Sequence, residues 1–177
     1  MRIKWMILIA VAILAMPASA SATVSPTDYK NAAKFCKALR ADMGAEAFKQ
    51  AYGTNKNKRN AYGKCVSKHA RTVDAIHSDA VKACKTEREA NPAAFAEKYG
   101  TNKNGKNALG KCVSKQSDDA TQAKQEAIVN AAKTCKAERT ADPAAFREKY
   151  GTNKNKRNAF GKCVSKTTKE NETQAQA

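Results

Sequence analysis

The sequence predicts an all-α protein, a linear array of three disulfide-stapled helical hairpin units joined by connecting helices. Three observations lead to this fold class. One segment of about 50 residues occurs three times, and six cysteines fall into three pairs of nearly constant separation. Capping residues and apolar periodicity mark helices within and between the copies. Self-similarity at this period is typical of an array of small units rather than of one large domain.

The first element of the chain is a predicted secretory signal peptide, residues 1–20. Arg2 and Lys4 precede an apolar run at residues 6–15, Pro17 ends the run, and residues 18–20 read Ala-Ser-Ala, a cleavage pattern. A run of this length is shorter than the about 20 residues that a membrane-spanning helix needs. We therefore expect a secreted or extracytoplasmic chain with no transmembrane segment after cleavage.

The three copies, called units 1, 2 and 3, occupy residues 25–68, 80–115 and 128–166. Each unit closes with the residues GTNKN, a variable pair, NA, one aromatic residue or leucine, and GKCVSK. Residues 69–79 and 116–127 are predicted to be helical connectors between the units. Residues 167–177 form a polar tail that we expect to be frayed or disordered.

Local signals bound a short helix inside each unit. Asn91-Pro92 and Asp142-Pro143 each combine a helix N-cap with proline at the first helical position. Gly100 and Gly151 are expected to end this helix in the left-handed conformation. The next helix carries the second cysteine of the unit, and we expect an asparagine side chain to cap its start: Asn60, Asn107 or Asn158.

The first connector predicts how the cysteines pair. In residues 60–90, which contain this connector, the residues at apolar positions alternate spacings of four and three, which is typical of a helix: Tyr62, Val66, His69, Val73, Ile76, Ala80 and Ala83. Such a helix places Cys65 and Cys84 about 28 Å apart, whereas a disulfide needs Cα atoms within about 7 Å. We therefore expect pairing within the units: Cys36–Cys65, Cys84–Cys112 and Cys135–Cys163. Each staple contributes about 3–4 kcal/mol to a unit with a small core.

Positive charge is concentrated in three segments of the chain. The formal net charge is +17, and it is +15 once residues 1–20 are removed. Residues 53–68, 100–115 and 151–166 contain no aspartate or glutamate and carry +14 of that charge. Their basic residues are the predicted anion-binding residues: Lys56, Lys58, Arg59, Lys64, Lys68, Lys103, Lys106, Lys111, Lys115, Lys154, Lys156, Arg157, Lys162 and Lys166.

The basic segments suggest a function in binding. Each leads into a helix N-terminus, where free backbone N–H groups and the helix dipole favour an anion. We expect a multivalent binder of anionic polymers at or outside the cell envelope: an envelope polysaccharide, extracellular nucleic acid or an anionic lipid surface. The alternative is a non-catalytic structural or spacer protein of the envelope whose lysines are only solvated surface. A membrane-active protein is a weaker alternative, because no helix pairs a broad apolar face with a basic one.

Catalytic, metal and cofactor chemistry is not indicated. No Ser-His-Asp or Cys-His arrangement recurs among the copies, so we expect neither an enzyme nor catalytic residues. The cysteines lack C-x-x-C spacing and no histidine falls inside a unit, which argues against zinc, and we expect no metal and no cofactor. His69 occupies one of the apolar positions of the first connecting helix and is expected to pack in the interior. His77 is expected to face solvent.

Overall fold

The structure, a computed structural model, describes residues 31–174. The predicted signal peptide, residues 25–30 of unit 1 and the last three residues of the tail lie outside the described residues. Residues 31–174 form seven helices and no strand, which confirms the all-α prediction: α1 (Ala32–Met43), α2 (Ala45–Tyr52), α3 (Ala61–Ala90), α4 (Pro92–Tyr99), α5 (Ala108–Ala141), α6 (Pro143–Tyr150) and α7 (Ala159–Gln174). None of these helices is both long and apolar enough to cross a bilayer.

Each unit consists of the end of one helix, a short helix, a loop and the start of the next long helix. A disulfide joins the two longer helices in each unit, and the pairs are those expected from the sequence: Cys36–Cys65, Cys84–Cys112 and Cys135–Cys163. Helix α3 contains both Cys65 and Cys84 without interruption, and α5 likewise contains Cys112 and Cys135. Residues 69–79 and 116–127 therefore lie inside these two continuous helices.

The short helices begin as expected but end differently. The side chains of Asn91 and Asp142 accept hydrogen bonds from the first-turn amides of α4 and α6, each ahead of a proline. Gly100 and Gly151, predicted to be left-handed, have φ of −71° and −75°. Glycine is needed there for space, because a Cβ on Gly100 would lie 2.4 Å from the carbonyl oxygen of Ala96.

The left-handed residues lie deeper in the loops instead. Lys58 and Lys156 have φ of 58° and 54°, and Gly105 stands at the equivalent place in unit 2 with φ of 63°. The Lys58 side chain returns to the end of the short helix, where Nζ donates to the carbonyl oxygen of Gly53 at 2.7 Å. The loop thus folds back on the last turn of the short helix. This close approach explains why the position directly after that helix, Gly53, Gly100 or Gly151, has no room for a side chain.

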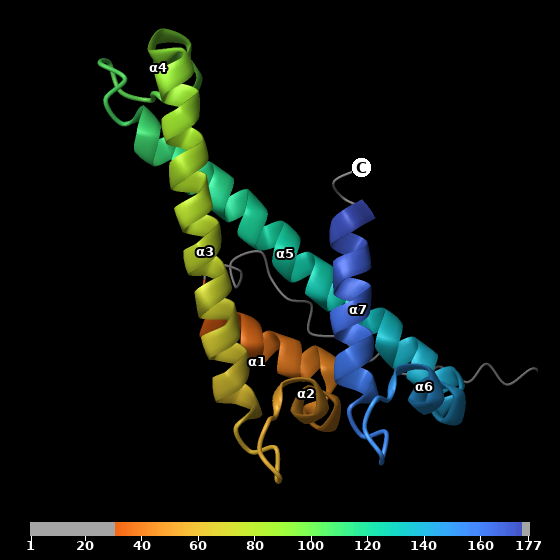
Figure 1. Ribbon diagram of the computed structural model, residues 1–177. Coiled ribbons are helices and arrows are strands. Elements are labelled where there is room, and N and C mark those ends of the chain that lie inside the picture. The colour runs from red at the N-terminus through yellow and green to blue at the C-terminus, as the bar shows by residue number, and fades with distance from the viewer. Residues whose placement is uncertain (1–30, 175–177) are drawn as a thin grey trace, which may run out of the picture.

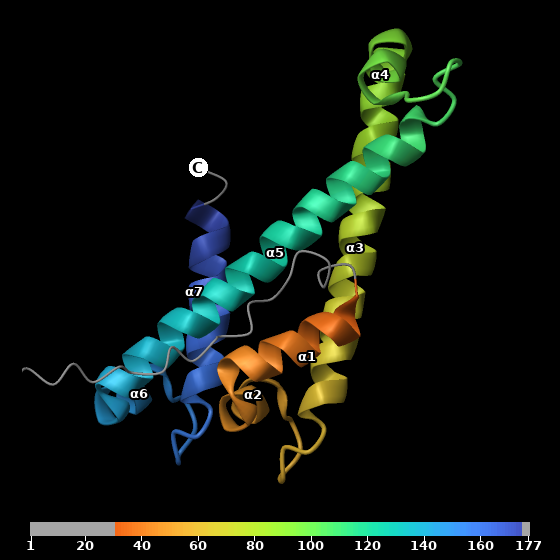
Figure 2. The same ribbon diagram turned by 180° about the vertical axis from the view of Figure 1, so that it is seen from behind.

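The units do not form the predicted linear array, because the chain doubles back at unit 2. Helix α3 runs from unit 1 to unit 2, and α5 leads back from unit 2 to unit 3, packed against α3 on the unit 2 side and diverging from it toward unit 3 (Figures 1 and 2). A hairpin between two connecting helices of similar length reverses the chain direction. Units 1 and 3 therefore meet at one end of the molecule, and unit 2 forms the other end.

Two separate hydrophobic cores follow from this arrangement. Units 1 and 3 share one core, which contains Phe35, Phe48 and Phe146 together with the disulfides Cys36–Cys65 and Cys135–Cys163. Unit 2 has its own small core, made mainly of Phe95, the Cys84–Cys112 disulfide and a few aliphatic side chains. We therefore expect unit 2 to depend on its disulfide more than the other units do.

Unit 1 differs from units 2 and 3 at the positions that meet unit 3. Units 2 and 3 each have a glutamate three residues after the first cysteine, and it binds a lysine and a tyrosine of the short helix: Glu87 with Lys98 and Tyr99, and Glu138 with Lys149 and Tyr150. Unit 1 replaces the glutamate with Leu39 and the lysine with Ala51. Leu39 is buried, and the small Ala51 allows α7 to approach α2 closely.

The tail is ordered as far as the structure describes it, contrary to the expectation of a frayed segment. Residues 167–174 continue α7 along α5, and Thr168 is buried. Lys124 Nζ pairs with a Glu172 carboxylate oxygen at 2.8 Å, and Asn171 donates to the carbonyl oxygen of Ala127. A polar segment is stable here because α5 offers it complementary partners.

Candidate anion-binding surface

The three basic loops have one shared internal structure. The side chain of Asn60 sits at the N-cap position of α3 but makes no capping hydrogen bond. Its Oδ1 accepts from the backbone N–H of Thr54 at 3.0 Å, and its Nδ2 donates to Thr54 Oγ1 at 2.7 Å. Asn107 with Thr101 and Asn158 with Thr152 repeat these bonds. The asparagines that were predicted to cap helices therefore hold the loops closed instead, because one amide side chain can accept and donate a hydrogen bond at once. We call each of these asparagine–threonine pairs an asparagine latch.

Because the latch points away from the helix, α3 and α5 both begin without a side-chain cap. The first-turn amide of Ala61 bonds to the carbonyl of Lys58, and the regular helical pattern starts at Lys64. The helix dipole is thus left uncompensated by a capping side chain at the point where the basic segment enters the helix.

The predicted anion-binding residues divide into exposed cations and residues with structural partners. All of them are exposed except Lys58 and Lys156, which are half-buried. Lys58 closes its own loop. Three others pair with carboxylates: Lys115 with Asp119 at 3.0 Å and Lys166 with Glu170 at 3.9 Å, each one helical turn away, and Lys156 of the third loop with Glu148 of α6 at 3.3 Å. The basic segments contain no acidic residues, but the fold places carboxylates from outside these segments beside some of their lysines.

One basic pocket, which we call the arginine pocket, lies where units 1 and 3 meet. Its volume is about 300 Å³, and its basic lining consists of Arg139, Arg147, Lys156 and Arg157. Gln50 of α2 and Asn155 of the third loop contribute amide groups. The guanidinium of Arg139 lies over the Phe160 ring, 4.8 Å from its centroid, which holds that side chain in place.

A second basic pocket, which we call the lysine pocket, lies beside the first loop. Lys64, Lys68 and Arg71 line it from successive turns of α3, opposite Tyr52 and Thr54, and its volume is about 360 Å³. No carboxylate lines either this pocket or the arginine pocket. Ala51 borders the lysine pocket and Gln50 borders the arginine pocket, so the short helix α2 connects the two.

The fold places two of the three basic loops at one end of the molecule. The loops that follow α2 and α6 project from the end formed by units 1 and 3, while the loop that follows α4 lies at the unit 2 end (Figure 1). Helix α3 separates the ends, with about 28 Å of helical rise between Cys65 and Cys84. The structure thus brings together the basic residues of units 1 and 3 and leaves apart Lys103, Lys106, Lys111 and Lys115.

Sequence reasoning missed three cations of these pockets. Arg71, Arg139 and Arg147 lie outside the acid-free segments, on helices whose neighbouring residues include acids. Arg71 had a visible signal, because it continues the spacing of Lys64 and Lys68 along one face of α3. The two arginines of unit 3 had none, since only the packing of α2, α5, α6 and α7 brings them together.

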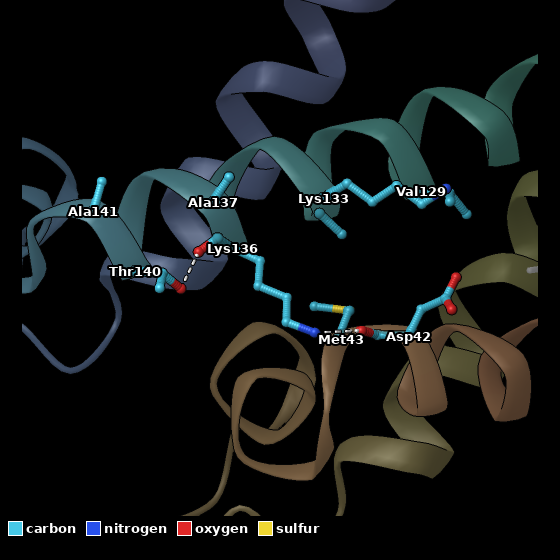
Figure 3. A pocket seen from close by; sticks show the side chains of 9 residues that line it. Asp42, Met43, Val129, Lys133, Lys136, Ala137, Thr140 and Ala141 are labelled. Atoms are coloured by element: carbon cyan, nitrogen blue, oxygen red, sulfur yellow. Dashed lines mark hydrogen bonds between the residues drawn. The ribbon is translucent and has the colours of Figure 1, made fainter. Parts of the chain in front are cut away.

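A further pocket of about 650 Å³ lies between the end of α1 and α5 (Figure 3). Met43 and Val129 supply part of its apolar wall, and Lys133 and Lys136 border it. Lys136 Nζ donates to the backbone carbonyl of Asp42 at 3.3 Å. The carboxylate oxygens of Asp42 are buried and make no hydrogen bond within residues 31–174, so this pocket is less suited to an anion than the two basic pockets.

His69 lies against a disulfide, which the sequence analysis did not anticipate. It is 2 % exposed, and its ring packs edge-on against Phe35 with centroids 4.6 Å apart, in agreement with the expected packing role. One of its nitrogens and the sulfurs of Cys36 and Cys65 lie within 4.8 Å of one another. Burial lowers the pKa of His69 to about 4, helped by the charges of Lys68 and Lys124. The imidazole is therefore neutral at pH 7.

His77 is exposed, as expected, but it has a neighbour on the other long helix. Its Nδ1 lies 3.4 Å from Ser117 Oγ, in a groove between α3 and α5 that Asp74 and Asp118 also line. Both His77 and Ser117 lie in the middle of helices. Backbone N–H groups there are bonded to carbonyls one turn earlier and cannot stabilise an oxyanion. The backbone at His77 and Ser117 therefore supplies no oxyanion hole beside this pair.

The fold and this surface define a class: an all-α protein with three intrachain disulfides and a basic surface at the end where its first and last units meet. The chain matches no protein-family model, no curated protein and no solved structure.

Proposed function

We propose that the protein is a non-enzymatic, exported binder of anionic polymers that uses the arginine and lysine pockets as its main sites. The observation that carries this proposal is the position of the two pockets, which flank α2 at one end of the molecule. Seven cations line them, and within residues 31–174 Lys156 alone among these seven is paired with a carboxylate, that of Glu148: Lys64, Lys68, Arg71, Arg139, Arg147, Lys156 and Arg157. A polymer with regularly spaced negative groups can occupy both pockets at once.

The two pockets differ in what they bind best. Guanidinium groups form paired hydrogen bonds with phosphate, sulfate or carboxylate oxygens, so the arginine pocket favours a single well-fixed group. Lysine ammonium groups act as mobile point charges, and the lysine pocket suits a polymer backbone that passes along α3. Candidate ligands are an envelope polysaccharide, extracellular nucleic acid and an anionic lipid surface.

The basic loop of unit 2 adds a second point of attachment. Because α3 holds it at the other end of the molecule, it reaches a distant part of the same polymer or a second polymer. Linked sites raise the affinity far above that of one site when the ligand spans them. No cofactor or metal is needed for this binding.

Export is part of the proposal. Three disulfides suit an oxidising compartment outside the cytoplasm. The predicted signal peptide, which lies outside the described residues, supplies the route.

A structural or spacer role remains the second candidate, and a specific observation favours it. Many of the residues that the copies share hold the loops closed. The asparagine latches do so, and so does Lys58 through its bond to the Gly53 carbonyl. Folding alone therefore explains part of the similarity among the copies, without any ligand.

Binding to single-stranded DNA, a sulfated polysaccharide and anionic lipid vesicles at several salt concentrations tests the proposal. For DNA, log affinity falls linearly with log salt, with a slope of about −0.7 for each phosphate neutralised. The triple variant Lys64→Gln, Lys68→Gln, Arg71→Gln should weaken binding and reduce the steepness of that slope by about 2.

The matched control removes the same charge from the other half of the same helix: Lys82→Gln, Lys85→Gln, Arg88→Gln, all three exposed. The control should leave the slope near the wild-type value. Equal losses in the two variants would mean that only net charge matters. Absence of binding to all three polymers at low salt would favour the spacer role.

A further inference from the structure

Unit 1 contains three soft metal-binding groups in one buried place. Helix α1 supplies Cys36, and α3 supplies Cys65 and His69, which lie four residues apart on one face of the helix. All three are buried, and their ligand atoms lie within 4.8 Å of one another. We propose that reduction of the Cys36–Cys65 disulfide converts this cluster into a Zn²⁺ site with two thiolate ligands and one imidazole ligand.

The donor set suits zinc. Zinc bonds to thiolate sulfur at about 2.3 Å and to histidine nitrogen at about 2.0–2.1 Å, so two of its ligands cannot be more than about 4.6 Å apart. The observed limit of 4.8 Å is close to this requirement. The opening of the S–S bond lets the sulfurs separate around the ion. Three protein ligands leave the fourth tetrahedral position for water or another small ligand.

The surroundings of His69 hold its ring in a fixed orientation. Tyr52 Oη lies 3.5 Å from His69 Nε2, and the Phe35 ring packs against the imidazole. A metal-bound histidine normally donates its other N–H to an oxygen acceptor, which sets the tautomer and the ring position. When Nδ1 binds the ion, the Tyr52 hydroxyl oxygen is placed to accept that hydrogen bond.

The chemical steps balance with a dithiol reductant. Thiol–disulfide exchange transfers two electrons and two protons to Cys36 and Cys65, and the reductant becomes a disulfide. Binding of Zn²⁺ then displaces both thiol protons. The reverse exchange with a disulfide oxidant passes two electrons from the thiolates to that disulfide, re-forms the Cys36–Cys65 S–S bond and releases Zn²⁺. The disulfide and the metal site therefore exclude each other.

The other two units provide an internal comparison. Gln116 occupies the position of His69 in unit 2 and lies against its disulfide, with Nε2 3.5 Å from the sulfur of Cys112. Thr167 occupies it in unit 3, with its hydroxyl 3.9 Å from the sulfur of Cys135. Neither side chain is a zinc ligand of imidazole type. The inference therefore assigns one site to each chain, in unit 1.

The test is a Co²⁺ titration of the whole chain after reduction and anaerobic removal of the reductant. The wild-type chain should bind one equivalent, with thiolate-to-cobalt charge-transfer absorption and the visible bands of tetrahedral Co²⁺. His69→Gln, which copies the unit 2 residue, should weaken binding by at least about 10–100-fold, the loss caused by removing an outer hydrogen-bonding partner alone. Gln116→His should raise the stoichiometry to two.

Circular dichroism keeps the test decisive if the reduced chain loses helicity. Zn²⁺ should then restore helicity to the wild-type chain and not to His69→Gln, because metal binding is coupled to folding. Equal stoichiometry in all three proteins, or charge-transfer absorption that is insensitive to His69, would overturn the inference. So would the absence of any Co²⁺ absorption in the reduced wild-type chain.

Discussion

Gly161 of α7 lies directly against Ala51 of α2, and this contact joins unit 3 to unit 1. A Cβ atom built on Gly161 would come within 3.1 Å of Ala51 Cα and of the carbonyl oxygen of Gln50. The equivalent glycines of the other units, Gly63 and Gly110, have open space around the same position. The repeated glycine therefore has a packing role in unit 3 alone.

Substitution at these equivalent glycines should affect the unfolding free energy differently in different units. Gly161→Val should cost about 1–3 kcal/mol of unfolding free energy, because its side chain cannot enter the interface without moving α2. Gly63→Val is the matched control and should change stability by no more than about 0.5 kcal/mol, since the position is exposed. Urea denaturation measures both. Equal stability of the two variants would show that units 1 and 3 do not pack as described.

The partner residue offers a second test of the same interface. Ala51→Lys copies into unit 1 the residue that units 2 and 3 have at this position. We expect a loss of about 1–3 kcal/mol, because the longer, charged side chain must fit where α7 lies. Hydrogen exchange should show reduced protection in α7 and little change in α4. Unchanged protection throughout the chain would contradict the prediction.

Burial of neutral His69 should make stability depend on pH. Its pKa is about 4 in the folded protein and about 6.5 when unfolded, so the unfolded chain binds the proton more readily. Its stabilising effect is complete above about pH 6.5 and is lost as the pH falls toward 4, by at most about 3 kcal/mol. Thermal melts of the oxidised protein across this range measure the effect. His69→Gln should show a flatter profile, and an identical profile would contradict the prediction.

Unit 2 should be the part of the fold most dependent on its disulfide, because its core is separate and small. The double variant Cys84→Ala, Cys112→Ala removes a cross-link worth about 3–4 kcal/mol. We expect α4 and the adjoining ends of α3 and α5 to lose hydrogen-exchange protection, while α1, α2 and α7 keep theirs. Loss of protection throughout the chain would show that unit 2 is instead essential for the whole fold.

The asparagine latch should stabilise its loop. Asn107→Ala removes the bonds to the Thr101 amide and hydroxyl, and we expect a loss of about 1–2 kcal/mol. Asn102→Ala in the same loop is the control, because Asn102 is bonded to Gly105 through its backbone carbonyl and not through its side chain. Denaturant unfolding compares the two variants. An equal effect would argue against the latch.

The sequence by itself determined the helices and the cysteine pairing. Asn91-Pro92 and Asp142-Pro143 start helices through contacts within one turn, and a helix between Cys65 and Cys84 excludes their pairing by distance alone. The position of His69 beside a disulfide was also within reach, because residues four apart on a helix share a face. These features depend on interactions that are local along the chain.

Only the tertiary structure decided how the units meet and where the cations gather. The contact of Ala51 with Gly161 joins residues 110 positions apart, and it depends on the absence of side-chain volume, which leaves no pattern in a sequence. The arginine pocket needs four helices and a loop to converge. Charge counted along the chain located the basic loops, but charge in space also depends on which acids the fold brings back to them, as Glu148 is brought to Lys156.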